Sequence, residues 1–475
     1  MTRTKIVCTL GPATDAPETL RGILAAGARV LRLNYSHGTQ AQQAARAEMA
    51  RSIARELGIP IGILADLQGP KMRIGDLAGG SVVLREGTTL TLTARPVPGS
   101  EREIPFAEPD VLADIRPGAR ILLDDGLLEL RAVGTDGADV VAEVVVGGEL
   151  SSRKGVTLPD TEVRMASMTD KDRGDARAAV AAGADFIALS FVRSPEHVAD
   201  LRRLLRSLGA EDTPIIAKIE KREALERFPE ILEAADGIMV ARGDLGVEIP
   251  PEDVPIHQKA IVRQCNTVGK PVIIATQMLQ SMIDNPRPTR AEASDVANAI
   301  LDGADAIMLS GETAVGRYPV ESVAMMGKIA RATEAHFPYG ARLREAADAR
   351  AASITDAISQ ATCEIAQELG ATAILASTRS GHTARMVAKY RPATPILAPT
   401  PDPKVAARLS LVWGVEPLLV PQFDTTDEMI AKAVDAARGQ GLVRAGDVVI
   451  ITAGVPIGGP GRTNMLKVHV VEQAG

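Results

Sequence analysis

The stretch TDKDRGDARAAVAAGADFIALS, residues 169–190, decides the fold, because it contains a helix that leads directly into a strand. Its alanine-rich first part predicts a helix over Thr169 to Ala182, with Asp and Lys early and Gly183 at its end. Its last part, Phe186 to Ser190, is a short apolar run typical of a buried strand. Helices and strands in this alternation are typical of βα units on a parallel sheet.

The same alternation continues on both sides of this stretch, and the apolar runs number about eight, as a closed (β/α)₈ barrel requires. The runs are Lys5 to Leu10, Arg29 to Leu33, Ile61 to Ala65, Phe186 to Ser190, Ile215 to Ile219, Gly237 to Val240, Val272 to Ala275 and Ala306 to Leu309. We therefore predict an α/β protein built on a TIM barrel.

A long segment between the third and fourth runs has a different character. From Arg73 to about Ala166 it is rich in Val, Thr, Leu and Gly, with turn signals such as Asp125-Gly126. This predicts a small β-barrel domain inserted after strand three, and linkers at Gly69-Pro70 and Leu158-Pro159 would let it move as a lid. Beyond Pro338 the βα alternation restarts, which predicts a separate open α/β domain. The expected domains are the barrel (1–70 and 167–340), the lid (71–166) and a C-terminal regulatory domain (345–475).

Composition limits the kinds of protein that this chain can be. Its 475 residues are 24% charged with a net charge of −7, which is typical of a soluble globular protein and not of a nucleic-acid-binding surface. No apolar run approaches the ~20 residues of a membrane span, and Met1 to Lys5 do not read as a signal peptide, so we expect a cytoplasmic protein. Cys8, Cys265 and Cys363 are too few and too widely spaced for a disulfide framework or a zinc site.

Charged and polar side chains gather where the expected strands end, and the active site of such a barrel lies at those ends. Because strand side chains alternate, Arg32 and Asn34 share one face, as do Lys218 and Glu220. The other strand-end residues are Asp66, Arg242-Gly243-Asp244, Thr276 and Ser310-Gly311-Glu312. A single such residue is usually a solvated loop residue, but charges crowded into a half-buried mouth are costly unless they bind one another, a metal or a substrate. Their convergence therefore predicts a functional site.

The residue types indicate the chemistry of this site. Glu220 and Asp244 supply hard carboxylate oxygens that suit Mg²⁺, and Arg32 and Lys218 suit an anionic, phosphate-bearing ligand. Gly243 to Gly246 should begin a helical turn whose free N–H groups can bind a carboxylate. Neither a P-loop nor a protein-kinase catalytic motif occurs, so a nucleotide would have to bind by another device.

Several of these segments resemble pyruvate kinase, over essentially the whole chain. They are Leu33 to Gly38, Ile216 to Glu220, Met239 to Pro250, Ala275 to Leu279, Asn285 to Asn298 and Met308 to Thr313. The resemblance implies transfer of the phosphoryl group of phosphoenolpyruvate to ADP, giving pyruvate and ATP in the last step of glycolysis. It also implies a homotetramer with an allosteric C-terminal domain, and a chain that lacks the extra C-terminal domain of some bacterial members.

The resemblance also implies roles for individual residues. Arg32 would contact the transferring phosphate and Lys218 would stabilise its charge, while Glu220 and Asp244 would hold Mg²⁺. The Gly243 and Asp244 amides would bind the substrate carboxylate, Thr276 would lie near the methylene carbon, and Ser310 would help to relay the proton through water. The residues expected to bind ADP and its own Mg²⁺ are Asn34, His37, Arg73 and, from the lid, Lys154.

The chain departs from the best-known members of this family in the segment Asp66-Leu67-Gln68-Gly69-Pro70-Lys71. Those members carry Thr-Lys-Gly-Pro-Glu there and bind K⁺ through residues that match Asn34, Ser36, Asp66 and Leu67. Here Gln68 replaces the usual Lys and Lys71 the usual Glu. We expect the Lys71 ammonium to take the place of K⁺, orienting Asp66 and neutralising phosphate charge, so that K⁺ is not required.

A second candidate site lies in the C-terminal domain, where a strand meets a helix. The segment resembles the effector-phosphate loop of the family, and it comprises Thr378, Arg379, Ser380, Gly381, His382 and Thr383. The alternative is an ordinary capped turn. Gly454 to Gly461 would form the other wall, and departures around Arg379, His382 and Val455-Pro456 leave the identity of the phosphorylated effector open.

Two other functions are consistent with parts of the pattern. A Mg²⁺-dependent pyruvate-enolate lyase or aldolase would also hold its metal through Glu and Asp, but it would lack a nucleotide lid. A non-catalytic metabolite sensor would not need Lys218, Glu220, Asp244 and Thr276 together. An assay with phosphoenolpyruvate and ADP distinguishes these alternatives.

Overall fold

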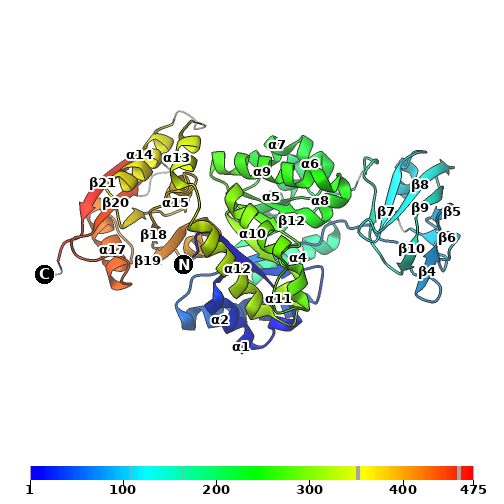
Figure 1. Ribbon diagram of the computed structural model, residues 1–475, viewed down its shortest axis with the longest axis horizontal. Coiled ribbons are helices and arrows are strands. Elements are labelled where there is room, and N and C mark those ends of the chain that lie inside the picture. Colours follow the sequence, from blue (N-terminus) through cyan, green and yellow to red (C-terminus); the bar gives the residue numbers. More distant parts are fainter. Residues whose placement is uncertain (1, 107, 164, 349–352, 457–461, 474–475) are drawn as a thin grey trace.

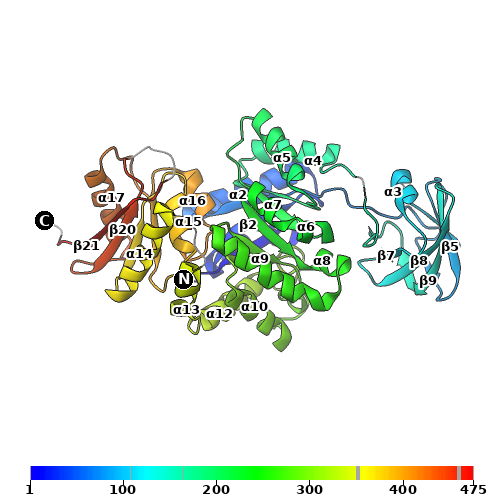
Figure 2. The ribbon, with the colours of Figure 1, turned by 90° about the horizontal axis from the view of Figure 1, so that it is seen from above.

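The computed structural model describes residues 2–106, 108–163, 165–348, 353–456 and 462–473. The C-terminal α/β domain, the barrel and the β domain follow one another along the long axis of the molecule (Figure 1). The view from above shows the same row (Figure 2). The N-terminus lies where the barrel meets the C-terminal domain (Figure 1). No helix in the described ranges is long and apolar enough to cross a membrane.

Eight parallel strands close into a barrel in the order β1-β16-β15-β14-β13-β12-β3-β2, which confirms the predicted fold class. Their bounds are β1 (Lys5–Leu10), β2 (Ala28–Asn34), β3 (Gly62–Asp66), β12 (Phe186–Leu189), β13 (Ile215–Ile219), β14 (Gly237–Ala241), β15 (Val272–Ala275) and β16 (Ala306–Leu309). All but β2 are buried along their whole length, as expected for strands that are covered by helices on one side and fill a packed interior on the other.

Helices surround this barrel. They are α1 (Pro17–Ala26), α2 (Gln40–Leu57), α4 (Asp170–Ala181), α5 (Pro195–Ser207), α6 (Arg222–Glu226), α7 (Phe228–Ala234), α8 (Arg242–Glu248), α9 (Val254–Val268), α10 (Arg290–Asp302), α11 (Gly311–Ala314) and α12 (Pro319–Glu334), with short 3₁₀ turns at Pro12–Thr14, Pro251–Asp253 and Gln280–Ile283. The helix expected from Thr169 begins at Asp170, because Thr169 is its N-cap and accepts a hydrogen bond from the Asp172 amide. The Asp172 side chain in turn accepts one from the Thr169 amide, which completes a capping box.

The inserted domain lies between β3 and β12 in the chain and forms two sheets around one core. The six-stranded sheet has the order β11-β7-β8-β9-β5-β6, and β10 pairs with β4. The strands are β4 (Ser81–Leu84), β5 (Thr89–Thr93), β6 (Glu103–Pro105), β7 (Arg120–Leu123), β8 (Leu128–Thr135), β9 (Asp139–Val146), β10 (Gly148–Ser151) and β11 (Val156–Thr157), with one short helix, α3 (Pro109–Asp114). Leu84 and Leu150 from the smaller sheet join the core of the larger one.

The C-terminal domain contains a five-stranded sheet in the order β19-β18-β17-β20-β21, with β21 antiparallel to the rest. Its strands are β17 (Ala373–Ala376), β18 (Ile396–Thr400), β19 (Val415–Leu419), β20 (Val448–Ala453) and β21 (Met465–Val470), and its helices are α13 (Tyr339–Asp348), α14 (Ile354–Glu368), α15 (His382–Ala388), α16 (Pro403–Leu409) and α17 (Thr426–Gly439). The sheet is open, as predicted.

The barrel and the C-terminal domain share a buried junction. Leu411 from the C-terminal domain joins the apolar interior of the barrel. Arg391 is buried, pairs with Asp305 at 3.0 Å and lies 4.9 Å from the centre of the Trp413 ring. The closed end of the barrel is therefore packed against the C-terminal domain, and its open mouth faces away from this junction.

Candidate active site at the barrel mouth

Arg32 and Asp66 form one ion pair at the mouth, because β2 and β3 lie side by side and end together. Arg32 Nε donates to Asp66 Oδ2 at 2.6 Å, and Arg32 Nη1 donates to Thr9 Oγ1 at 3.1 Å. Burial disfavours the charged form of Asp66, but Lys218 and Arg32 outweigh it and hold the pKa of Asp66 below its ordinary value. The guanidinium group of Arg32 is thus fixed by a carboxylate that stays ionised.

Lys218 lies at the centre of the mouth, on β13. Its Nζ is 2.9 Å from Glu220 Oε1 and 3.3 Å from Asp66 Oδ1, and it donates a hydrogen bond of 2.7 Å to Ser190 Oγ. Burial opposes the positive charge, but Asp66 and Glu220 more than compensate, so the pKa of Lys218 lies above its ordinary value. The site therefore holds a permanently charged ammonium group.

Ser190 is a residue that the sequence does not single out. Its hydroxyl accepts from Lys218 and donates to the Leu67 carbonyl at 2.7 Å. The only signal in the sequence is its place as the last residue of the predicted run Phe186 to Ser190, directly after the end of β12.

Glu220 and Asp244 are the two predicted metal ligands, and they line one small cavity of about 40 Å³ together with Lys71 and Asp125. Burial raises the pKa of Glu220 and Asp244 adds to this effect, whereas Lys218 opposes it. Two carboxylates in such a place repel each other unless a cation lies between them, and hard oxygen donors suit a divalent ion that keeps positions open for substrate and water. Within the described residues no group of three His, Cys, Asp or Glu side chains could hold a metal, so this pair fits a metal only if substrate and water complete its coordination.

Thr276 lies at the end of β15, next to the first turn of α8. Its Oγ1 accepts a hydrogen bond of 2.8 Å from the Gly243 amide and donates one of 2.6 Å to the Ala275 carbonyl. Thr276 and Gln277 both adopt positive φ angles, of 69° and 56°. Helix α8 begins at Arg242, one residue before the turn expected at Gly243, and its first amides have no partner within the helix.

Ser310 follows β16, and its buried Oγ has no hydrogen-bond partner among the described residues. Its amide donates to Glu312 Oε2 at 2.7 Å, and Glu312 also accepts from the Leu279 amide at 3.1 Å. The hydroxyl is therefore free to bind a water or a substrate atom.

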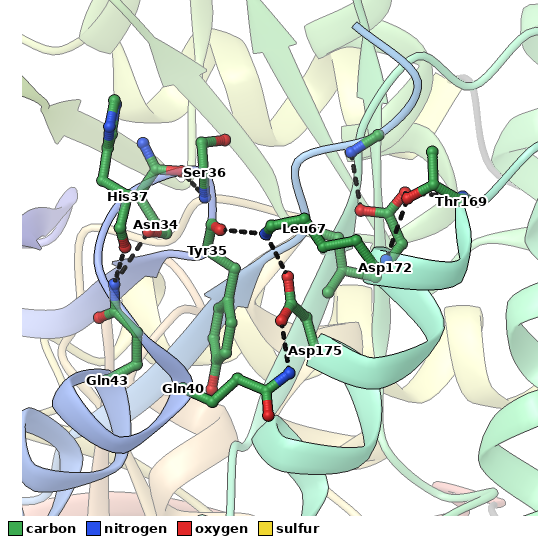
Figure 3. A network of polar contacts seen from close by, with 12 residues as sticks. Asn34, Tyr35, Ser36, His37, Gln40, Gln43, Leu67, Thr169, Asp172 and Asp175 are labelled. Atoms are coloured by element: carbon green, nitrogen blue, oxygen red, sulfur yellow. Dashed lines mark hydrogen bonds and ion pairs between the residues drawn. The ribbon is translucent and has the colours of Figure 1, made fainter.

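The loop after β2 carries the predicted residues Asn34, Ser36 and His37, and α2 holds it in place (Figure 3). The Ser36 amide donates to Asn34 Oδ1 at 3.0 Å, and the buried Gln43 side chain donates to the carbonyls of Asn34 and His37 at 2.9 and 2.8 Å. The Tyr35 amide donates to the Asp66 carbonyl at 3.0 Å, which joins this loop to the end of β3. The four residues expected to bind a monovalent cation, Asn34, Ser36, Asp66 and Leu67, therefore lie on two adjoining segments.

Lys71 does not lie where we expected it. Its Nζ is 3.8 Å from Asp125 Oδ1 of the lid and 3.8 Å from Asp244 Oδ1 of the barrel. Asp66 is instead paired with Arg32 and Lys218. The expectation that Lys71 orients Asp66 is wrong, because the Lys71 ammonium group lies near two other carboxylates and Asp66 is already paired with two cations.

Two of the predicted nucleotide ligands, Arg73 and Lys154, lie together where the lid joins the barrel. The two strands of this neck pair through Arg73 and Gly155. Arg73 Nη1 donates to the Arg153 carbonyl at 3.0 Å, and Lys154 Nζ is 2.8 Å from Asp124 Oδ1. The hydrogen bond to Asp124 raises the pKa of Lys154.

The predicted effector segment joins β17 to α15. Thr378 Oγ1 accepts from the Gly381 amide at 2.9 Å, and Gly381 has a φ of 81°. Arg379 Nη2 donates to the Phe423 carbonyl at 3.2 Å, and Ser380 is exposed. Burial lowers the pKa of His382, and Thr383 Oγ1 accepts from Thr463 Oγ1 at 3.1 Å. The other proposed wall, Gly454 to Gly461, lies in part outside the described residues.

Comparison with known proteins identifies the relatives of this chain. The family model described as pyruvate kinase, barrel domain, matches residues 1–323, and the model described as pyruvate kinase, alpha/beta domain, matches residues 356–469. A pyruvate kinase of Geobacillus stearothermophilus is 49% identical over 471 residues, which are 99% of this chain and 80% of the relative. Pyruvate kinase 2 of Synechocystis sp. is 50% identical over 475 residues, 79% of its length, and a pyruvate kinase of Clostridium acetobutylicum is 43% identical over 473 residues, all of its length.

Proposed function

The chain belongs to the pyruvate kinase family, and we propose that Arg32 and Lys218 at its barrel mouth act directly on the phosphoryl group that it transfers. The reaction of this family converts phosphoenolpyruvate and ADP to pyruvate and ATP. The observation that carries the proposal is the Lys218 ammonium group, which is buried, charged and held by Asp66, Glu220 and Ser190 beside Arg32.

The mouth is suited to phosphoryl transfer because that reaction needs positioning and charge neutralisation more than covalent chemistry. Arg32 binds the phosphate of phosphoenolpyruvate, and its pairing with Asp66 prevents it from swinging away. Lys218 stabilises the negative charge on the group in flight, and no reorganisation is needed because its carboxylate partners already fix it.

Members of the family generally use a divalent metal, and we propose Mg²⁺ held by Glu220 and Asp244. When bound, the ion would neutralise negative charge on the enolate and carboxylate of the substrate. The amides of Gly243 and Asp244 at the start of α8 would bind the same carboxylate, and the Gly243 amide would then exchange its present acceptor, Thr276 Oγ1, for the substrate.

Transfer leaves enolpyruvate, which must gain a proton at its methylene carbon to become pyruvate. We assign Thr276 to the position beside this carbon, and its hydroxyl is oriented by Gly243 and Ala275. Ser310 has a hydroxyl free to hold the water that relays the proton.

The lid and the loop after β2 supply the nucleotide site in this proposal. Arg73 and Lys154 present two positive charges at the neck of the lid, and Asn34 and His37 lie on the loop after β2. These charges suit the phosphates of ADP. Because Lys71 places a further cation beside Asp244, we propose that K⁺ is not required.

Regulation and assembly are further parts of the proposal. A phosphorylated metabolite would bind at Thr378 to Thr383 and change the affinity for phosphoenolpyruvate. A homotetramer rests on the family resemblance alone. A cytoplasmic location is supported by the three cysteines, all of which are free and buried.

An assay of pyruvate formation from phosphoenolpyruvate with and without ADP tests the proposed reaction. We expect pyruvate to form only when ADP is present, with one ATP for each pyruvate. Pyruvate formed without ADP would mean that the phosphoryl group is transferred to water, which would contradict the kinase proposal. Release of pyruvate by cleavage of a carbon–carbon bond in another substrate would instead support a lyase on the same barrel.

A further inference from the structure

Arg242 connects three elements on one side of the mouth, and none of the roles above includes its side chain. It is the first residue of α8, and only 11% of the side chain is exposed. Its Nη1 and Nη2 each lie 2.7 Å from an oxygen of Asp295, which belongs to α10. Nη2 also donates to the Thr276 carbonyl at 2.8 Å. A guanidinium group held by two parallel bonds has a fixed plane, so its third bond has a fixed direction.

The Thr276 carbonyl belongs to the peptide group between the two residues with positive φ, Thr276 and Gln277. Such a conformation costs on the order of 1–3 kcal/mol for a residue other than glycine, and it persists only where the surroundings hold it. Arg242 stabilises this conformation, because its Nη2 donates to the Thr276 carbonyl oxygen. The same Nη2 lies 2.8 Å from the sulfur of Met278, the residue after Gln277.

The conformation of this peptide determines where the Thr276 hydroxyl lies. The hydroxyl reaches the Gly243 amide, and Gly243 follows Arg242 in the chain. A methyl group on Gly243 would lie 3.4 Å from Thr276 Oγ1, so the two segments are already in close contact. A small movement of Arg242 would therefore move both Thr276 and the amides that bind the substrate carboxylate.

We propose that Arg242, fixed by Asp295, is a positioning residue for the proton-transfer half of the reaction. It sets the Thr276 backbone and thereby the distance of the Thr276 hydroxyl from the methylene carbon. This inference rests on the role proposed above for Thr276. The proton goes to the carbon of the enolate from the water proposed at Ser310, beside the Thr276 hydroxyl, and in the reverse direction pyruvate loses a methyl proton to the same water.

The test compares Arg242→Lys and Asp295→Asn with the wild-type enzyme. Arg242→Lys keeps the charge but cannot bind both Asp295 oxygens and Thr276 in one plane, and Asp295→Asn removes the charge that fixes the guanidinium group. Arg202→Lys is the matched control, because Arg202 also pairs with an aspartate, Asp236, and donates to a backbone carbonyl, but at the opposite end of the barrel. Three quantities are measured: kcat and KM for phosphoenolpyruvate, the exchange of pyruvate methyl hydrogens in D₂O with Mg²⁺ and ATP, and the thermal midpoint.

We expect kcat and the exchange rate to fall together by about tenfold to a hundredfold in both variants, as for a displacement of about 1 Å, with KM changed by less than about threefold. Arg202→Lys should retain both rates. Exchange at the wild-type rate in a folded Arg242→Lys or Asp295→Asn would overturn the inference, as would an equal loss in Arg202→Lys. If Arg242→Lys does not fold, the kcat and exchange rate of Asp295→Asn alone test the inference. A wild-type enzyme with neither transfer nor exchange would contradict the proposed function itself, whereas normal variants beside an active wild type would contradict only the role of Arg242.

Discussion

Ser190 contacts both Lys218 and the carbonyl of Leu67, so one hydroxyl group joins the proposed catalytic lysine to the segment that leads into the lid. Lys218 Nζ donates a hydrogen bond to Ser190 and forms ion pairs with Glu220 and Asp66. Removing the Ser190 hydroxyl leaves the ammonium group free to tilt toward the two carboxylates and away from the substrate.

Ser190→Ala is expected to lower kcat by about tenfold, because a hydrogen bond to a charged group contributes about 1.5–3 kcal/mol and part of this is recovered by the remaining partners. Steady-state kinetics with phosphoenolpyruvate measures the effect. Ser167→Ala is the control, since Ser167 also bonds a charged residue, Asp200, but outside the mouth. A Ser190→Ala enzyme with wild-type kcat and KM would show that Ser190 only caps its strand.

At the scale of elements, the segment from β3 to the lid carries the unusual Lys71. Its ammonium group lies between Asp125 of the lid turn and Asp244 of the barrel, at 3.8 Å from each. A cation tied to the chain at this point neutralises charge without being bound from solution, even though it does not contact Asp66 as the sequence had led us to expect.

The wild-type enzyme is therefore expected to keep nearly full activity in a tetramethylammonium buffer that contains neither K⁺ nor Na⁺, and Lys71→Glu is expected to need K⁺. Activity is measured as a function of added K⁺, with the tetramethylammonium salt adjusted to constant ionic strength to control for screening. Activation of the wild type by about tenfold or more would refute the substitution of Lys71 for K⁺ while leaving the family assignment intact.

The segment between β17 and α15 presents the exposed Ser380 beside Arg379 and the free start of a helix. If a phosphate group binds there, Ser380→Asp should abolish the response, because it places a like charge in the phosphate site. The affinity for phosphoenolpyruvate is measured with and without sugar phosphates and nucleoside monophosphates. Basal kinetics should not change. Wild-type kinetics that none of these compounds alters would show that the segment is an ordinary turn.

Most strands could be predicted from the sequence, and the contacts between them could not. Runs such as Lys5 to Leu10 and Ile215 to Ile219 coincide with β1 and β13 because they are short, apolar and buried throughout. The pairing of Ser190 with Lys218 and of Arg242 with Asp295 joins residues that lie 28 and 53 positions apart, and their spacing in the chain carries no sign of it. Likewise, the Lys71 ammonium group lies near Asp125 and Asp244, and the residue type alone does not indicate these partners.

At the scale of the whole molecule, the barrel and the C-terminal domain meet at a buried junction that contains Lys5. Its Nζ donates to the Val415 carbonyl at 2.6 Å across this junction. Burial lowers the pKa of Lys5 from its ordinary value of 10.5 to about 8, although Glu416 opposes the effect. Between these two pH values the unfolded chain binds more protons than the folded one, so this group makes stability rise with pH across that window.

Lys5→Met lacks this titration, so its unfolding free energy does not share this rise with pH. The unfolding free energy of the variant minus that of the wild type should therefore fall by up to about 3 kcal/mol from the lower to the upper end of the window. Trp413, the single tryptophan, lies in the same junction next to Arg391, so its fluorescence reports on this region during unfolding. Lys432→Met, which removes a half-buried lysine on α17, is the control. If the unfolding free energies of Lys5→Met and the wild type changed in parallel with pH, the account of Lys5 would be contradicted.

The central proposal is that Lys218, held at the barrel mouth by Asp66, Glu220 and Ser190, stabilises the phosphoryl group in flight. Lys218→Met tests this most directly, because it removes the charge while keeping most of the volume of the side chain. Binding of phosphoenolpyruvate is measured at equilibrium, and transfer to ADP is measured by steady-state kinetics. We predict that phosphoenolpyruvate still binds but that kcat falls by about 10³-fold or more, since the charge matters most where negative charge develops in the transition state. A Lys218→Met enzyme whose kcat stays within about tenfold of wild type would contradict the assignment.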